Sequence, residues 1–168
     1  MLTTERLLLR KPRLEDAEAL LAAYSDPETM RYIGDGSTTD IEGMRAGIEK
    51  WLARWDATGI GFFVLEHDGV VVGRAGFLVW DPETWTISEL DDGSEVELGW
   101  TLIREHWGYG YATEAAVALR DWTDRSRLIS LIQHGNERSE RVAERIGERY
   151  ERDVVVRGVP TRLYSIER

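Results

Sequence analysis

Two spacings of hydrophobic residues recur along the chain, and each predicts one kind of element. Apolar residues three or four positions apart, the period of a helix, extend through residues 14–24 and residues 41–55. Asp40 is a typical helix N-cap before the second segment, and Gly59 is placed to end it. The first half of the chain is therefore expected to contain two amphipathic helices, the first of which ends at Asp26 and Pro27.

Other segments show the alternation or the short apolar runs that are typical of β-strands. The clearest is residues 95–102, in which every second residue is apolar. Asp68-Gly69 lies between two apolar runs and predicts a tight hairpin. Strands are expected at residues 6–10, 62–66, 70–79, 95–102, 128–133, 154–156 and 161–166.

The order of these elements predicts the fold class. A glycine-rich turn at residues 107–112 leads into an apolar helix that ends near Trp122, and Asn136 opens a short helix that Gly147 is placed to stop. The resulting order, β-α-α-β-β-β-α-β-α-β-β, indicates a mixed α/β (α+β) fold with a mostly antiparallel sheet and one crossover helix between two parallel neighbours. Residues 1–168 are expected to form a single domain, since no linker or repeat interrupts the pattern.

Composition and charge exclude several classes of function. The chain has 21 Lys and Arg against 31 Asp and Glu, and the net charge of −10 argues against binding to a nucleic-acid backbone. It has no cysteine, which excludes disulfides, thiolate nucleophiles and cysteine-based zinc sites, and its three histidines lack the spacing of metal ligands. No metal is expected. No segment resembles a secretory signal or a membrane span, so a cytoplasmic protein without a membrane partner is expected.

The glycine-rich turn is the segment that predicts chemistry. The small residues Gly108, Gly110 and Ala112 allow a ligand to approach the backbone closely. The unpaired N–H groups and the dipole of the following helix favour an anion such as phosphate, to which Thr113 can add a hydroxyl donor. Two nucleotide motifs fail here: the Walker motif needs Lys-Ser/Thr after the last glycine, and the dinucleotide fingerprint needs a small residue where Thr113 stands.

An ordered set of motifs resembles the GNAT-type N-acetyltransferase superfamily. The set comprises Glu97-Leu98-Gly99-Trp100, residues 107–115, and Asn136-Glu137-Arg138-Ser139 followed by Gly147. The opening residues 2–10 and the closing residues 158–164 are most similar to its branch of ribosomal-protein N-terminal acetyltransferases, the RimJ/RimL-like branch. The resemblance implies a sheet of six to seven strands with about four helices, splayed between the two parallel strands at residues 95–103 and 128–133.

The same resemblance implies that acetyl-CoA is the cosubstrate. Its diphosphate would lie on the turn, and its pantetheine arm would run beside the strand that ends at Leu102 and Ile103, in the manner of an added strand. Asn136 would hydrogen-bond the pantetheine, and Ser139 would lie near the thioester sulfur. The cofactor-binding residues expected from the resemblance are Leu102, Ile103, Gly108, Tyr109, Gly110, Tyr111, Ala112, Thr113 and Asn136.

Two residues are expected to carry the chemistry. Glu97 is the candidate general base, working through water on the attacking amine, and Ser139 is the candidate donor to the departing thiolate. A backbone N–H near Leu98 and Gly99 would hold the oxyanion. Two simpler interpretations stay open: Glu97 as a solvated strand residue and Ser139 as part of a helix cap.

The acceptor is expected to be a primary amine, in particular the N-terminal α-amine of a protein or peptide. The open alternatives are a polyamine, antibiotic or aminoacyl acceptor, and a non-catalytic acyl-CoA-binding protein; the oligomer is expected to be a monomer or a homodimer. The loops at residues 34–39 and 80–94 are expected to shape the acceptor site. Three features depart from the family pattern: Trp107 in a Gln/Arg position, Glu148 in a Phe position, and a short connection at residues 121–127.

Overall fold

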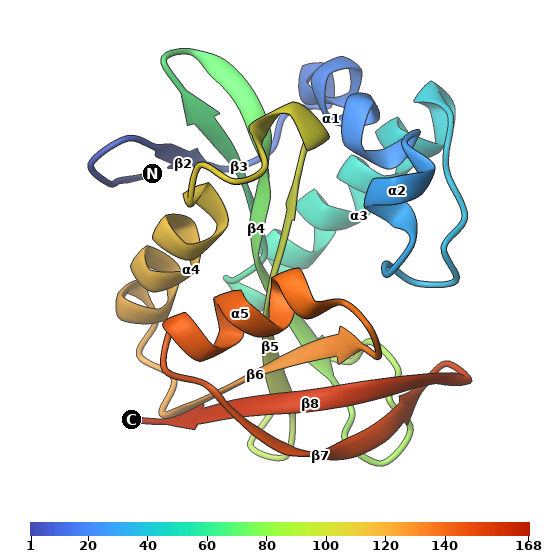
Figure 1. Ribbon diagram of the computed structural model, residues 1–168, viewed down its shortest axis with the longest axis vertical. Coiled ribbons are helices and arrows are strands. Elements are labelled where there is room, and N and C mark those ends of the chain that lie inside the picture. The colour runs from blue at the N-terminus through green and yellow to red at the C-terminus, as the bar shows by residue number, and fades with distance from the viewer.

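The alternating segments assemble into one eight-stranded sheet with the strand order β1-β2-β3-β4-β5-β6-β8-β7. The computed structural model describes residues 1–168 (Figure 1). The strands are β1 (Leu2–Thr3), β2 (Leu8–Arg10), β3 (Phe62–His67), β4 (Val70–Trp80), β5 (Glu95–Leu102), β6 (Arg127–Gln133), β7 (Arg149–Val156) and β8 (Val159–Glu167). All neighbours are antiparallel except β5 and β6.

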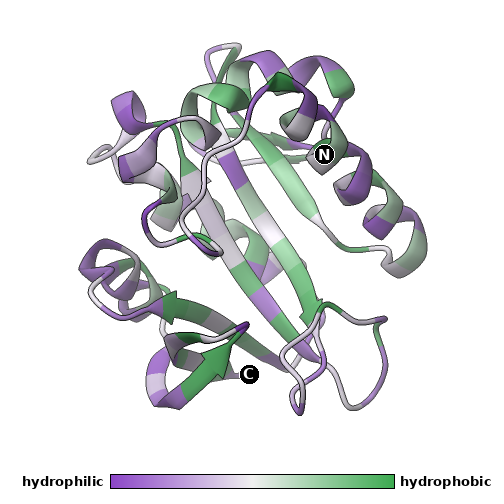
Figure 2. Ribbon diagram, turned by 90° about the vertical axis from the view of Figure 1, so that its right-hand side faces the viewer, coloured by the Kyte–Doolittle hydropathy of each residue, from purple (hydrophilic) through white to green (hydrophobic).

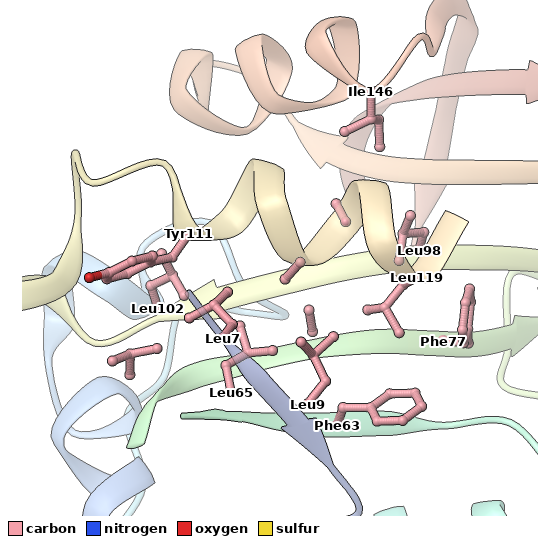
Figure 3. Close-up of a cluster of buried hydrophobic side chains, with 14 of the residues drawn as sticks. Leu7, Leu9, Phe63, Leu65, Phe77, Leu98, Leu102, Tyr111, Leu119 and Ile146 are labelled. Carbon is pink, nitrogen blue, oxygen red and sulfur yellow. The ribbon is translucent and has the colours of Figure 1, made fainter. Parts of the chain in front are cut away.

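Helices cover both faces of the sheet (Figure 1). They are α1 (Ala17–Tyr24), α2 (Pro27–Met30), α3 (Ile41–Thr58), α4 (Tyr111–Trp122) and α5 (Glu137–Arg145), with 3-10 turns at Leu14–Asp16 and Arg104–His106. The helices α1 and α3 pack on the face of β3 that presents Phe62 and Val64. The helix α4 packs on the opposite face, where Leu119 lies against Phe77 and Leu98 (Figure 3). The strand alternation therefore separates two hydrophobic layers.

The sheet splays between β5 and β6. The strand β5 pairs with β4 along its whole length, and β6 pairs with β8 along its whole length. In contrast, β5 and β6 are in register at a single pair, Glu97 with Ile129. Figure 2 shows the C-terminal strands turned away from the long central strands. Residues 99–102 of β5 therefore have no partner on β6, as the resemblance implied.

The structure confirms the expected fold class and adds short elements that periodicity does not reveal. The sheet has eight strands rather than six or seven because Leu2–Thr3 forms a separate short strand. There are five α-helices rather than about four because Pro27 begins the single-turn helix α2. Asp26 accepts hydrogen bonds from the backbone N–H groups of Glu28 and Thr29, so Asp26-Pro27 ends one helix and also caps the next. No helix has the length and apolar character needed to cross a membrane.

The short connection between α4 and β6 is held firmly. Arg127, the first residue of β6, makes salt bridges with Glu95 on β5, Glu151 on β7 and Glu167 on β8 over 2.8–3.0 Å. Arg168 donates hydrogen bonds to backbone carbonyl oxygens within the connection. The shortened segment thus ties four strands together at the end of the sheet where β5 and β6 are closest.

Candidate functional site

The turn before α4 presents unpaired backbone N–H groups. Gly108 and Gly110 both have φ = +84°, a left-handed conformation that glycine adopts without strain. Gly110 is the N-cap of α4, and its carbonyl accepts the first intrahelical hydrogen bond, from the N–H of Glu114. The N–H groups of Tyr111, Ala112 and Thr113 therefore have no partner within the helix, and the helix dipole makes this end positive. The turn is suited to an anion.

Arg6 and Glu114 hold this turn in place. Arg6 donates from Nε to Glu114 Oε2 over 2.7 Å and from Nη1 to the carbonyl of Tyr109 over 2.9 Å. Thr4 donates its hydroxyl to the other oxygen of Glu114 over 2.6 Å. Although burial alone would raise the pKa of Glu114, the hydrogen bonds from Thr4 and Arg6 keep it below its ordinary value. The opening residues of the chain thus act as a support for the turn, a role that sequence patterns did not reveal.

The turn forms one wall of a cleft of about 840 Å³, called here the turn cleft. Most of the expected cofactor-binding residues line it: Leu102, Gly108, Gly110, Tyr111, Ala112, Thr113 and Asn136. Ile103 does not, because it is buried and its N–H donates to the carbonyl of Val72. Tyr109 does not either: its side chain is 60% exposed, and its carbonyl accepts the hydrogen bond from Arg6.

Trp107 joins β5 to the turn. Its indole N–H donates to the carbonyl of Leu102 over 2.9 Å, and the guanidinium of Arg138 on α5 lies over its ring at 4.4 Å. The aromatic residue in the family's Gln/Arg position therefore connects three elements of the turn cleft. The backbone N–H groups of the turn, which suit an anion, do not depend on this side chain.

Asn136 and Ser139 lie at the start of α5. Asn136 is the N-cap, and its Oδ1 accepts a hydrogen bond from the N–H of Ser139 over 3.4 Å. Both residues line the turn cleft and also a second cleft of about 480 Å³, called here the strand cleft. These two residues therefore cap the helix and also line both clefts. The cap uses the side-chain oxygen of Asn136 and the backbone N–H of Ser139.

Glu97 lies in the strand cleft. Its Oε2 accepts a hydrogen bond from the indole N–H of Trp80 over 2.7 Å. Burial raises the pKa of Glu97 above its ordinary value, against the opposing effects of the Trp80 hydrogen bond and the positive charge of Arg74. Glu97 is thus a partly buried carboxyl group that lines the strand cleft and forms no salt bridge.

The two clefts meet at the splay of the sheet. Trp100 and Thr101 of β5 line both, as do Asn136 and Ser139. From the loop expected to shape the acceptor site, Gly34 and Asp35 line the strand cleft, whereas residues 81–94 of the second loop do not. The two clefts therefore share walls at the end of β5 and the start of α5.

Glu148 is a buried carboxyl group close to this gap. Its side chain is fully buried, and neither oxygen makes a hydrogen bond. The neighbouring hydroxyl of Ser130 instead donates to the carbonyl of Leu98 over 2.8 Å. Burial, with a contribution from the charge of Glu97, raises the pKa of Glu148 to about 8. The residue in the family's Phe position is therefore a neutral acid at pH 7.

Comparison with known proteins decides the family. The model of the acetyltransferase (GNAT) domain matches residues 6–149. The chain belongs to the GNAT acetyltransferase family. It is 36% identical over 135 residues to the uncharacterized N-acetyltransferase p20 of Bacillus licheniformis. The matched region covers 79% of this chain and 70% of that protein. As a member of this family, the chain is an acetyl-CoA-dependent N-acetyltransferase.

Solved structures of the family share this fold. The crystal structure of an acetyltransferase from Agrobacterium tumefaciens is 30% identical, with a TM-score of 0.79 over 99% of this chain and 94% of that one. RimL, a ribosomal L7/L12 α-N-protein acetyltransferase solved in complex with coenzyme A, also has a TM-score of 0.79, over 98% of this chain and 95% of that one. At 16% identity, the likeness to RimL is one of fold.

Proposed function

We propose that this GNAT protein transfers the acetyl group of acetyl-CoA directly to a primary α-amine, such as the N-terminal amine of a protein or peptide. The observation that carries the proposal is the meeting of the turn cleft and the strand cleft at the splay, with Glu97 in one and the free N–H groups of α4 in the other. Two substrates that enter from opposite sides are held in contact by such an arrangement, which removes most of the entropic cost of a bimolecular step.

The turn cleft has the features that acetyl-CoA requires. The unpaired N–H groups of Tyr111, Ala112 and Thr113 match a diphosphate. Residues 99–102 of β5 lack a partner on β6, so their backbone groups are available to the amides of a pantetheine arm. RimL, which shares this fold, was solved in complex with coenzyme A, and this supports a place for acetyl-CoA in the turn cleft. Asn136 stands between the two regions, with its side-chain N–H₂ available to a carbonyl.

In the proposed reaction, Glu97 accepts the proton that the acceptor's ammonium group must lose, directly or through one water. The raised pKa of Glu97 brings it closer to that of the amine, which favours the transfer. The neutral amine attacks the acetyl carbonyl carbon, an N–C bond forms, and the C–S bond breaks to leave the thiolate. The backbone N–H near Leu98 and Gly99 stabilises the developing oxyanion. The hydroxyl of Ser139 donates a proton to the departing thiolate and regains one, directly or through water, from the nitrogen, which loses its second proton as the amide forms.

The cost of deprotonation favours an α-amine over a lysine side chain. An α-amine with a pKa near 7.7–8.0 costs about 1.2 kcal/mol to make neutral at pH 7, whereas a lysine with a pKa near 10.4 costs about 4.6 kcal/mol. One partly buried carboxyl group is a sufficient base for the former. The motifs at both ends of the chain support a place in the RimJ/RimL-like branch, whose member RimL is a protein α-N-acetyltransferase.

The test is release of free coenzyme A from acetyl-CoA across a panel of amines. We expect turnover with short peptides, and we expect Glu97→Gln to lower kcat by about 10²–10⁴-fold. Glu95→Gln is the matched control, since Glu95 lies on the same strand but is paired with Arg127. An unchanged rate in Glu97→Gln would disprove the role of Glu97. Binding of acetyl-CoA without turnover on any amine would favour a non-catalytic protein, and turnover on polyamines or antibiotics alone would favour a small-molecule enzyme.

A further inference from the structure

Arg74 is a buried cation in the strand cleft that forms no salt bridge with a carboxylate. It lies on β4, and the residue is 8% exposed. Its Nε donates to the hydroxyl of Tyr24 over 2.8 Å, and its guanidinium lies 3.9 Å from the centre of the Phe62 ring. These contacts fix the plane of the guanidinium but use only one of its five N–H groups. A buried charge without a counter-ion is costly unless a ligand supplies one.

The free end of Arg74 points to the part of β5 that Glu97 occupies. Arg74 and Thr101 are register partners, so the side chains of Arg74, Thr101, Gly99 and Glu97 share one face of the sheet. A Cβ on Gly99 would lie 3.5 Å from Arg74 Nη1 and 3.5 Å from Glu97 Oε1, so these two atoms are no more than 7 Å apart. Because residue 99 is glycine, the space between the cation and the carboxyl group is open.

Thr101 supplies a second, independent sign of a missing ligand. The residue is 5% exposed, it lines the strand cleft, and its hydroxyl makes no hydrogen bond. A buried hydroxyl without a partner costs free energy that a bound acceptor atom would recover. The two orphan donors, Arg74 Nη1 and Thr101 Oγ1, come from paired positions on adjacent strands. Neither donor is hydrogen-bonded to an acceptor in the protein, and two such donors from paired positions indicate an anionic ligand group.

We infer that Arg74 and Thr101 bind a carboxylate carried by the acceptor amine, a few bonds away from the nitrogen that receives the acetyl group. This inference rests on the proposed function, and it names the substrate class. An ammonium at Glu97 and a carboxylate at Arg74 fit an amino-carboxylate whose two charges span the open floor at Gly99. The strand cleft, at about 480 Å³, lies within the range of sites for small ligands. The carboxylate can belong to a free amino acid or to an acidic residue at the start of a peptide.

Binding is measured first, because it does not depend on turnover. Calorimetric titrations in the presence of coenzyme A compare two matched pairs of probes: alanine with alaninamide, and the amidated peptides Glu-Ala-Ala and Gln-Ala-Ala. We expect the carboxylate member of at least one pair to bind ten times or more tightly than its neutral partner. The first pair reports on a free amino acid and the second on a peptide. Equal affinity within both pairs would overturn the inference.

Variants show whether Arg74 and Thr101 are responsible. Arg74→Gln is expected to remove the preference for the carboxylate, and Thr101→Val, which keeps the shape of the side chain, is expected to reduce it several-fold. Thr101→Val also serves if Arg74→Gln does not fold. The control is Arg54→Gln, a half-buried arginine on α3 that lines neither cleft. A preference that survives both Arg74→Gln and Thr101→Val would refute the assignment.

Turnover with the same probes separates this inference from the proposed function. Suppose that kcat/KM is higher for the carboxylate probes because their KM is lower, and that Arg74→Gln abolishes this difference. That result supports both the carboxylate site and the proposed function. Equal turnover of charged and neutral probes would leave the acetyltransferase intact and overturn the carboxylate site. Binding that depends on Arg74 without acetyl transfer to any probe would leave the carboxylate site intact and overturn the proposed function.

Discussion

The indole N–H of Trp80 donates a hydrogen bond to Oε2 of Glu97 over 2.7 Å. Burial raises the pKa of Glu97, and this bond opposes the shift because it stabilises the carboxylate. Replacing Trp80 with Phe removes the donor, so the pKa of Glu97 is expected to rise further. Since the base acts when deprotonated, the acidic limb of the profile of kcat/KM against pH should move upward by about one to two pH units.

The control for this variant is Trp85→Phe. Trp85 is buried in the same hydrophobic cluster as Trp80 but makes no hydrogen bond to Glu97. Both substitutions remove similar volume, and only Trp80→Phe should displace the acidic limb. An equal displacement in the two variants, or none in Trp80→Phe, would show that Glu97 does not set that limb.

Arg6 is expected to govern affinity for acetyl-CoA without touching it. The salt bridge with Glu114 and the bond to the Tyr109 carbonyl hold the turn whose N–H groups face the turn cleft. Arg6→Ala should raise the KM for acetyl-CoA roughly tenfold, because misplaced positioning groups weaken binding and catalysis. Arg45→Ala, which removes an exposed partner of Glu42 on α3, makes the same charge change away from the turn and should leave this KM unchanged. Initial rates at varied acetyl-CoA concentration measure both.

Glu148 should make stability depend on pH. The folded chain holds a proton on Glu148 up to a pKa of about 8, whereas the unfolded chain loses it near the ordinary value of about 4.3. Between these values the native state binds more protons, so the free energy of unfolding falls as pH rises, by about 1.4 kcal/mol per pH unit, and the decline ends above pH 8.

Glu148→Gln removes this titration. The difference in free energy of unfolding between Glu148→Gln and the unmodified protein, measured by urea denaturation, should therefore increase in favour of the variant from pH 5 to pH 8. Subtracting the two curves cancels the other titrating groups. A difference that does not change with pH would contradict the buried, protonated state of Glu148.

The sequence patterns predicted the main elements and the location of the turn, because both depend on local chemistry. The alternation in β5 and the stripe on α3 act within one element, so they are visible in the chain. The short helix α2 was missed, although Asp26-Pro27 is the signal that begins it. Four residues are too few to show a helical period.

The support of the site depends on contacts between distant residues, which periodicity does not reveal. Arg6 and Glu114 are far apart in the chain, as are Arg74 and Glu97, and only the pairing of strands and the packing of α4 bring each pair together. The burial of Glu148 is of the same kind. Its unusual residue type is visible in the sequence, but its burial and its lack of hydrogen-bond partners depend on tertiary packing. The cofactor-binding residues of the turn, in contrast, could be predicted from the sequence because a single loop carries them.

The central claim is that the free N–H groups at the start of α4 bind the diphosphate of acetyl-CoA. Isothermal titration calorimetry at neutral pH with acetyl-CoA and with acetylpantetheine, which lacks the diphosphate and the nucleotide, tests it most directly. We predict binding of acetyl-CoA in the range of about 1 μM to 1 mM and binding of acetylpantetheine at least tenfold weaker. Absence of heat with acetyl-CoA, or equal affinity for the two molecules, would contradict the claim.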